Sequence, residues 1–202
     1  HFAGLINAVL RKIATGGRPL LRDVKAGQVN TPPWLWSRWC HGYGPVVTEA
    51  IARSHGSQPP LDVSVKRNHA FWAERLGGLL LPTGTVRLQP NQGMVDLLEG
   101  YSDGAWWIQD AAAAMPVKLL GDLSGKTVLE LCAAPGGKTL QLCAAGADVT
   151  AVDMSASRLK RMAENLGRAG YHPEVIHGDA LQYEPQRQFD AVLLDAPCSA
   201  TG

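Results

Sequence analysis

Three carboxylates and one thiol in the second half of the chain occupy positions where side chains commonly do chemistry. Asp153, Asp179 and Asp195 each follow a short apolar stretch of strand length, and Cys198 follows Asp195 in the turn DAPCSATG. If these stretches are parallel strands of one sheet, their carboxyl ends meet at one edge and line a single crevice. The spacing therefore predicts a site with three acidic groups and one thiol.

A turn between a strand and a helix adds backbone to the same crevice. The segment VLELCAAPGGKTLQL contains Gly137-Lys138-Thr139, which is how a nucleotide-triphosphate phosphate loop ends. That loop needs a glycine where this chain has Cys132, and Pro135 removes one amide donor. A phosphate-loop ATPase is therefore only a minor alternative, and the dinucleotide pattern G-x-G-x-x-G is absent.

The charge of the crevice indicates which nucleoside would fit it. Asp153 lies 17 positions after Gly136 and can accept hydrogen bonds from both ribose hydroxyls, while Asp179 can hold an adenine amino group. Acidic groups disfavour a polyphosphate and favour a nucleoside with a positive group. S-adenosylmethionine, with its sulfonium and ammonium, has this chemistry. For each aspartate, the alternative is a structural role such as a helix cap.

The position of Cys198, after a proline at the end of an expected strand, predicts that its thiol faces the crevice and acts on a pyrimidine. Carbon 5 of the ring is a poor nucleophile, but a thiolate that adds to carbon 6 makes the ring enamine-like. The activated carbon 5 can then take a methyl group from a sulfonium. Asp195 can hydrogen-bond the cytosine edge and stabilise charge on the ring.

The elements that would position these groups alternate along the chain. Strand-length apolar stretches alternate with helix-length stretches, which is typical of a parallel, doubly wound sheet of the α/β class. The expected helices are Thr139–Ala145 and Ala156–Ala169, and the expected strands are Thr127–Leu131, Asp148–Val152, Glu174–Ile176 and Asp190–Leu194.

The first 60 residues are expected to be largely helical. His1–Ala14 is amphipathic, and Gly16-Gly17 followed by Pro19 should end this helix. A second helix should begin at Pro32-Pro33 with the Thr31 side chain as its cap. Its aromatic side chains can stack on RNA bases, but packing of the three tryptophans against the next domain is the favoured interpretation. The aromatic residues are Trp34, Trp36, Trp39 and Tyr43.

A small α+β subdomain is expected between Pro59-Pro60 and the core. Alternating apolar and polar residues predict a strand at Leu61–Val65, and Asp110 is well placed to cap a helix. The other expected elements are a helix near 69–76 and strands near 85–88 and 105–108. The domains predicted from these boundaries are 1–26, 27–60, 61–109 and an incomplete core at 110–202.

Composition limits the partners and the location of the protein. The 202 residues carry a formal net charge of +1, so a polyanion must be held by local basic groups such as Lys66-Arg67. Apolar runs are far shorter than the ~20 residues of a membrane span, and the four cysteines form no CxxC pair for zinc. We expect a cytoplasmic protein without metal, with a monomer favoured.

Four basic residues lie in the helix expected at Ala156–Ala169, and a solvated helix face explains them better than RNA binding does. These are Arg158, Lys160, Arg161 and Arg168.

Four motifs resemble, in order and spacing, those of the Sun family of RNA cytosine-5 methyltransferases: LELCAAPGGKT, AVDMSASRL, HGDA and LLDAPCSATG. WIQDAAAA is similar to the segment before that family's core. GLINAVLRKI resembles the last helix of the NusB-like RNA-binding domain that bacterial ribosomal members carry. The resemblance implies a Rossmann-like methyltransferase sheet and, as substrate, a cytosine in small-subunit ribosomal RNA.

The resemblance also implies residue roles. The PCS-turn cysteine, here Cys198, would help to release the methylated product, and Asp195 would share the catalytic site. The attacking thiolate belongs to a later TCS-type segment, which we expect beyond Gly202 together with further strands. The implied cofactor loop is Cys132, Ala133, Ala134, Pro135, Gly136, Gly137 and Lys138, and the further implied cofactor-binding positions are Asp153, Arg158, Asp179 and Asp195.

One alternative from another functional class stays open. The chain can instead belong to an RNA-binding or assembly factor that keeps a methyltransferase fold without catalysis. The absence of a cysteine on the strand after Gly202 would favour this alternative.

Overall fold

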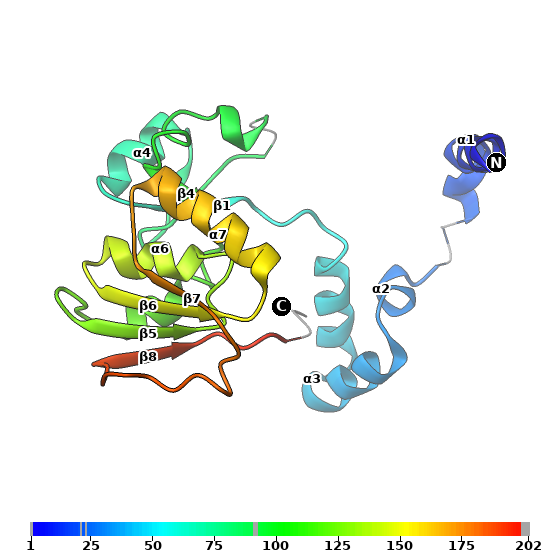
Figure 1. Ribbon diagram of the computed structural model, residues 1–202. Coiled ribbons are helices and arrows are strands. Elements are labelled where there is room, and N and C mark those ends of the chain that lie inside the picture. The colour runs from blue at the N-terminus through cyan, green and yellow to red at the C-terminus, as the bar shows by residue number, and fades with distance from the viewer. Residues whose placement is uncertain (1, 21, 23, 91–92, 199–202) are drawn as a thin grey trace. The chain divides into compact units, whose positions relative to one another are not determined.

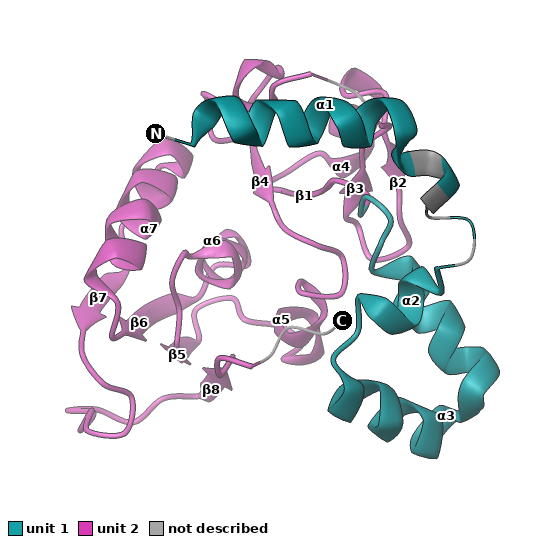
Figure 2. Cartoon of the chain, turned by 90° about the vertical axis from the view of Figure 1, so that its right-hand side faces the viewer, with its two compact units in different colours: residues 1–59 teal, residues 60–202 magenta. Residues whose placement is uncertain are grey.

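The computed structural model describes residues 2–20, 22, 24–90 and 93–198, and its elements are labelled in Figure 1. The chain divides into two compact units, His1–Pro59 and Pro60–Gly202 (Figure 2). The first unit is helical. The second contains two sheets, and every site residue expected from the sequence belongs to it.

Helix α1 (Ala3–Leu20) begins the first unit and is longer than the sequence predicts. It continues through Gly16-Gly17 and contains Pro19, so the predicted end at the glycines is wrong. Glycine lowers helix stability by about 1 kcal/mol without forbidding a helix, and Pro19 stands one residue before the end. The apolar stripe of this helix is 48–70% exposed; it consists of Phe2, Leu5, Ile6, Val9, Leu10 and Ile13.

Helices α2 (Ala26–Val29) and α3 (Pro33–Ser54) complete the first unit. Pro32 occupies the N-cap position of α3, and the Thr31 hydroxyl donates instead to the Gly27 carbonyl at 2.7 Å. Thr31 therefore closes α2, and the prediction that it caps the next helix is wrong. Helix α3 is kinked at Gly44, where φ is 78°, immediately before Pro45.

The aromatic side chains of α3 differ in exposure. Trp34 and Tyr43 are each 61% exposed. Trp36 and Trp39 are partly buried, and the Trp39 ring meets the His55 ring edge-on with centroids 5.4 Å apart. The packing of the three tryptophans against the following domain stays a prediction.

The second unit begins with an antiparallel sheet in the order β2-β3-β1-β4. Val63, Val86 and Trp106 are fully buried at its centre. The α+β character and three of the strands agree with the sequence prediction, whereas β2 was not expected. The elements are β1 (Asp62–Val65), α4 (His69–Arg75), β2 (Leu79–Leu80), β3 (Val86–Arg87), the 3-10 helix η1 (Val95–Leu97) and β4 (Trp106–Ile108).

A turn and a short helix connect the two sheets. The Asp110 carboxylate accepts hydrogen bonds from the amides of Ala112 and Ala113 at 2.8 and 3.2 Å. Asp110 thus caps the turn that leads into α5 (Met115–Leu119), close to its predicted role.

The second sheet is parallel throughout and has the order β7-β6-β5-β8 (Figure 1). From β5 the chain moves outward through β6 to β7 and then returns to pair β8 with the other edge of β5. This reversal makes the carboxyl ends of the paired strands β5 and β8 a topological switch point, where doubly wound sheets bind ligands. The elements are β5 (Thr127–Leu131), α6 (Gly137–Ala144), β6 (Asp148–Asp153), α7 (Ala156–Ala169), β7 (Glu174–His177) and β8 (Ala191–Leu194).

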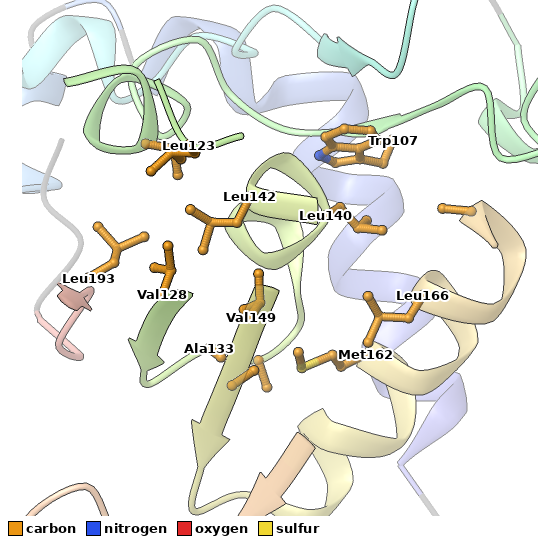
Figure 3. Close-up of a cluster of buried hydrophobic side chains, with 14 residues drawn as sticks. Trp107, Leu123, Val128, Ala133, Leu140, Leu142, Val149, Met162, Leu166 and Leu193 are labelled. Carbon is orange, nitrogen blue, oxygen red and sulfur yellow. The ribbon is translucent and has the colours of Figure 1, made fainter. Parts of the chain in front are cut away.

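The core of this sheet is formed by apolar side chains from its strands and from the two helices (Figure 3). Met162 and Leu166 of α7 are buried with Leu140 and Leu142 of α6. Burial of such a side chain contributes about 1.5–3 kcal/mol, so this cluster fixes both helices against the strands. The predicted bounds of α7 and β5 agree with the structure, and the Rossmann-like fold class is confirmed.

The carboxyl end of α7 is fastened to the antiparallel sheet. Arg168 Nη1 donates to the carbonyls of Tyr101 and Trp106 at 2.7 and 3.2 Å, and the guanidinium lies 4.0 Å from the Tyr101 ring centroid. The Lys66 ammonium donates to the Ala169 carbonyl at 2.7 Å. The prediction of a solvated face is therefore wrong for Arg168, because its partners lie in a part of the chain far away in sequence.

Candidate functional site

The turn between β5 and α6 forms the centre of the site. Cys132 and Gly136 have positive φ values of 61° and 97°, and the Ala134–Pro135 peptide bond is cis. The Ala133 amide donates to the Val152 carbonyl at 3.1 Å, which ties the turn to β6. The backbone between these residues is therefore folded tightly at the carboxyl end of the central strand.

One face of α7 holds this turn from the outside. Arg158 donates a hydrogen bond to the Ala134 carbonyl, and Asn165 Nδ2 donates to the Pro135 carbonyl at 3.2 Å. Met162 lies between them on the same face, since spacings of three and four residues share a helix face. A Cβ atom on Gly136 would stand 2.8 Å from Met162 Cγ, so glycine permits this close approach.

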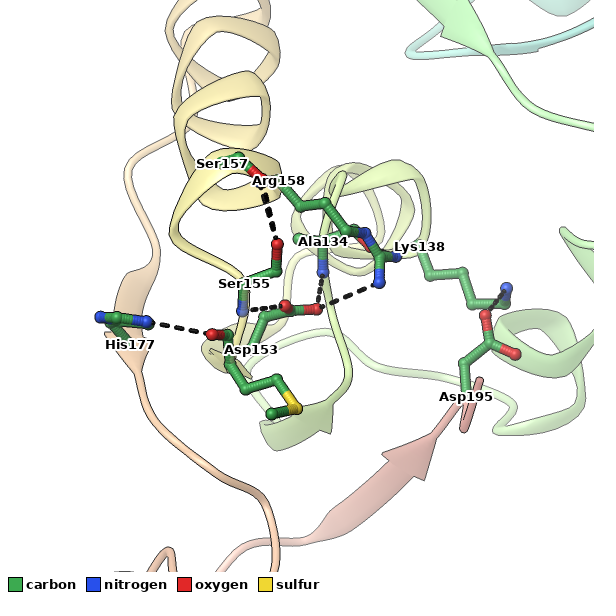
Figure 4. A network of polar contacts seen from close by, with 9 residues as sticks. Ala134, Lys138, Asp153, Ser155, Ser157, Arg158, His177 and Asp195 are labelled. Carbon is green, nitrogen blue, oxygen red and sulfur yellow. Dashed lines mark hydrogen bonds and ion pairs between the residues drawn. The ribbon is translucent and has the colours of Figure 1, made fainter. Parts of the chain in front are cut away.

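Asp153, at the end of β6, is 4% exposed and faces the turn (Figure 4). Its Oδ2 accepts a hydrogen bond from the Ala134 amide at 2.9 Å, and its Oδ1 accepts one from the Ser155 amide at 2.8 Å. Arg158 Nη1 is 3.9 Å from Oδ2. The carboxylate thus positions the turn and the start of α7, and each oxygen keeps a further lone pair for a ligand.

Asp195 follows β8 on the opposite side of the turn. Its Oδ2 is 2.6 Å from Lys138 Nζ, with the Asp195 side chain 57% exposed and the Lys138 side chain 13% exposed (Figure 4). This ion pair joins the end of β8 to the first turn of α6. The structure therefore brings Asp153, Lys138 and Asp195 together around the turn at the switch point.

Asp179 follows β7 and is partly buried. Its Oδ1 accepts a hydrogen bond from the Leu181 amide at 2.9 Å, so it closes its own turn. The sequence prediction placed it at the same edge as Asp153, and the parallel pairing of β6 with β7 satisfies this requirement.

Sequence reasoning did not find Glu130, a carboxyl group in the middle of the site's central strand. It is 1% exposed, and its Oε2 accepts a hydrogen bond from Thr139 Oγ1 at 2.5 Å. Burial raises its pKa to about 7, against the opposing effects of the Thr139 hydrogen bond and the Lys138 charge. A single acidic residue in the apolar strand VLELC was the signal that could have identified it.

The cysteines differ in their surroundings. Cys143 packs against the core, and burial raises the pKa of its thiol to about 12, which makes it a poor nucleophile at neutral pH. Burial, followed by the charge of Asp153, raises the pKa of Cys132. Cys198 is exposed beyond the end of β8. Of the four, Cys198 has the position expected of a thiol that meets a substrate, while its neighbours 199–202 lie outside the described residues.

Two further findings concern the described part of the chain. It contains no group of three or more side chains that would bind a metal ion. None of its helices combines the length and the apolar character that a membrane-spanning helix requires.

Known proteins resemble this chain in sequence. Residues 117–202 match the family described as 16S rRNA methyltransferase RsmB/F. The ribosomal RNA small subunit methyltransferases B of Serratia proteamaculans and Escherichia coli are each 37% identical over 217 aligned positions. Each alignment covers 98% of this chain and 50% of the relative, so the chain spans about half the length of these relatives.

Solved structures share the fold. A methyltransferase homologue from Pyrococcus horikoshii superposes with a TM-score of 0.72 at 24% identity, over 87% of this chain and 62% of that one. NSun6 from the same organism, solved with SFG, has a TM-score of 0.72 at 16% identity, over 85% and 72% of the two chains. The sequence matches agree with the family resemblance of the site motifs, and residues 117–202 are the part of the chain that the 16S rRNA methyltransferase RsmB/F family model covers.

Proposed function

We propose that the protein containing this chain transfers a methyl group from S-adenosylmethionine to carbon 5 of a cytosine in small-subunit ribosomal RNA. The observation that carries this proposal is the convergence of the turn at 132–138 with Asp153 and Asp195 at the β5–β8 switch point. The curated relatives are named as small-subunit ribosomal RNA methyltransferases, which supports the RNA class.

The described residues fit S-adenosylmethionine. Asp195 is more than half exposed, and Asp153 and Asp179 have unused lone pairs, so acceptors are available for ribose hydroxyls, an adenine amino group and the ammonium. The carboxylates of Asp153 and Asp195 stand beside the cations Arg158 and Lys138, and they would offset part of the positive charge of a sulfonium. Cys132 to Lys138 would hold the cofactor through the backbone, and the bound cofactor would supply an electrophilic methyl group.

Arg158 is proposed to act on the cofactor through the turn. Its guanidinium donates to the Ala134 carbonyl and lies near the Asp153 carboxylate. It therefore holds the turn against both α7 and the end of β6. Lys138 is proposed to orient Asp195 through their ion pair, so that the carboxylate stays at the carboxyl ends of β5 and β8.

Asp195 and Cys198 are proposed to act at the base. Asp195 would hydrogen-bond the cytosine edge, and the exposed Cys198 would assist release of the methylated product. In the family that the motifs resemble, the attacking thiolate lies in a TCS-type segment, and none of the four cysteines here belongs to such a segment. The target base would be extruded from its stack to reach this edge.

Bisulfite sequencing of ribosomal RNA tests the proposal. Cells with the intact gene should show a protected cytosine in small-subunit ribosomal RNA, and cells without the gene should lose that protection. A gene carrying Asp195→Asn should behave like the deletion. If the RNA is unmodified in all three while the protein still binds it, the non-catalytic alternative is correct.

A further inference from the structure

A cavity lies in the Pro60–Gly202 unit, between the antiparallel sheet and the parallel sheet with its helices. Its volume is about 360 Å³, within the range of small-molecule sites. It is lined by residues of β1, α5 and the turn before β3, and by Gln141, Ala144 and the C-cap residue Ala145 at the end of α6 remote from Gly137. The cavity is therefore distinct from the turn that forms the candidate cofactor site.

The titratable side chains that line this cavity are basic. Lys66, His69 and Lys118 line it, and the described lining residues include no carboxylate. Lys118 donates one hydrogen bond to the Thr83 carbonyl, and Lys66 donates one to the Ala169 carbonyl. Each ammonium has three donors, so both retain donors for a ligand.

Two of these basic groups converge on Gly84, where φ is +80°. A Cβ atom placed there would stand 3.7 Å from Lys118 Nζ and 3.8 Å from His69 Nε2. The nitrogen atoms of both side chains therefore border the same small space, which glycine leaves open. An oxyanion in this space would meet donors from two elements.

An independent observation comes from Thr85, which lines the same cavity. It is 1% exposed, and its hydroxyl is buried with no hydrogen-bond partner among the described residues. A buried hydroxyl without a partner is destabilising, and a water, an ion or a ligand commonly satisfies such a group. Thr85 therefore brings to the wall of the cavity a residue whose hydroxyl has unused hydrogen-bonding capacity.

We propose that this cavity is a phosphate-binding site formed by Lys118, His69 and Thr85, with Lys66 at its margin. Lysine is a common point-charge partner of phosphate, and the absence of carboxylates among the described lining residues disfavours a cationic ligand. The volume exceeds that of a lone phosphate, so the phosphate is carried by a larger molecule. A nucleotide unit within RNA and a free nucleotide share this chemistry.

Calorimetric titration of the full-length protein with inorganic phosphate tests the site. We expect saturable binding that weakens at least roughly tenfold in Lys118→Gln, because a charge-assisted hydrogen bond is lost. Lys160→Gln, an exposed lysine of α7 outside the cavity, should bind phosphate as the wild type does. Absence of saturable binding, or equal affinity in the Lys118 variant, would overturn the proposal.

Thr85→Val gives a second test that separates binding from folding. The isosteric change removes a buried hydroxyl without a described partner, so stability to urea should stay equal or increase. Phosphate affinity should nevertheless fall. A Thr85→Val protein with wild-type phosphate affinity would exclude the hydroxyl from the site.

Competition identifies the source of the phosphate. A single-stranded RNA oligonucleotide that displaces inorganic phosphate, and that binds more weakly to Lys118→Gln, would place substrate RNA in the cavity. Displacement by a nucleoside monophosphate alone would indicate a free nucleotide. The titration needs no methyl donor, so its outcome is independent of the proposed methyl transfer.

Discussion

At the scale of single residues, the turn after β5 depends on side chains that hold its backbone. Asp153 accepts a hydrogen bond from the Ala134 amide, and Arg158 donates one to the Ala134 carbonyl. Gly136 leaves room for the Met162 side chain. These contacts explain why the motif CAAPGGK requires an acidic residue at the end of β6. The structural and ligand-binding interpretations of Asp153 are therefore compatible, because the same carboxylate can serve both.

Gly136→Ala should destabilise the protein and weaken binding of S-adenosylhomocysteine. The new methyl group would meet Met162 Cγ at 2.8 Å, and alanine would have to adopt the positive φ of this position, which is unfavourable for it. Together these effects should lower the free energy of unfolding by about 1–3 kcal/mol. Urea unfolding and calorimetry would measure the two effects. The matched control is Gly167→Ala on α7, where a Cβ meets nothing within 4 Å and should stabilise the helix by about 0.5–1 kcal/mol. Equal stability of the two variants would contradict this account of Gly136.

Glu130 should make stability depend on pH. The pKa of Glu130 is about 7 in the folded chain, whereas the ordinary value for a glutamate is 4.5. The folded state therefore keeps this proton up to a higher pH than the unfolded state does. The associated stability is fully present below pH 4.5 and is lost as the pH rises through about 7, by roughly 3 kcal/mol. Glu130→Gln keeps an acceptor for Thr139 and does not ionise, so its stability advantage should grow between pH 4.5 and 8. Urea unfolding at several pH values checks this, and parallel curves for the two proteins would refute it.

At the scale of elements, α7 connects the turn after β5, the parallel sheet and the antiparallel sheet. Its middle holds the turn, its apolar face packs on the sheet, and its carboxyl end fastens the antiparallel sheet through Arg168. The apolar period of Ala156–Ala169 predicts the helix and its buried face. The same pattern does not reveal that Arg168 is an interface residue, because its partners Tyr101 and Trp106 lie more than 60 positions away.

Arg168→Ala should lower the free energy of unfolding by about 2 kcal/mol, because two hydrogen bonds from a charged donor to backbone carbonyls are lost. Arg161→Ala, an exposed arginine on the same helix, is the control and should change stability by less than about 0.5 kcal/mol. Chemical denaturation measures both. Comparable losses in the two variants would show that Arg168 is not a structural contact.

At the scale of the whole molecule, local pattern predicts the parallel sheet well and the first unit less well. Strands and helices of the core follow from apolar periodicity, and the three aspartates follow from the rule that parallel strands share an edge. The end of α1 and the cap of α3 were predicted wrongly, since glycine, proline and threonine each have more than one local use. The basic cavity joins residues from five separate stretches of the sequence, so no local pattern could have indicated it.

The most direct measurement of the central claim is calorimetry of S-adenosylhomocysteine binding to the full-length protein and two aspartate variants. Asp195 and Asp190 flank the opposite ends of β8, and Asp190 binds the amide and hydroxyl of Thr127, away from the turn. We predict that the wild type and Asp190→Asn bind equally, and that Asp195→Asn binds roughly tenfold more weakly. No binding by the wild type, or equal binding by both variants, would contradict a cofactor site at the β5–β8 switch point.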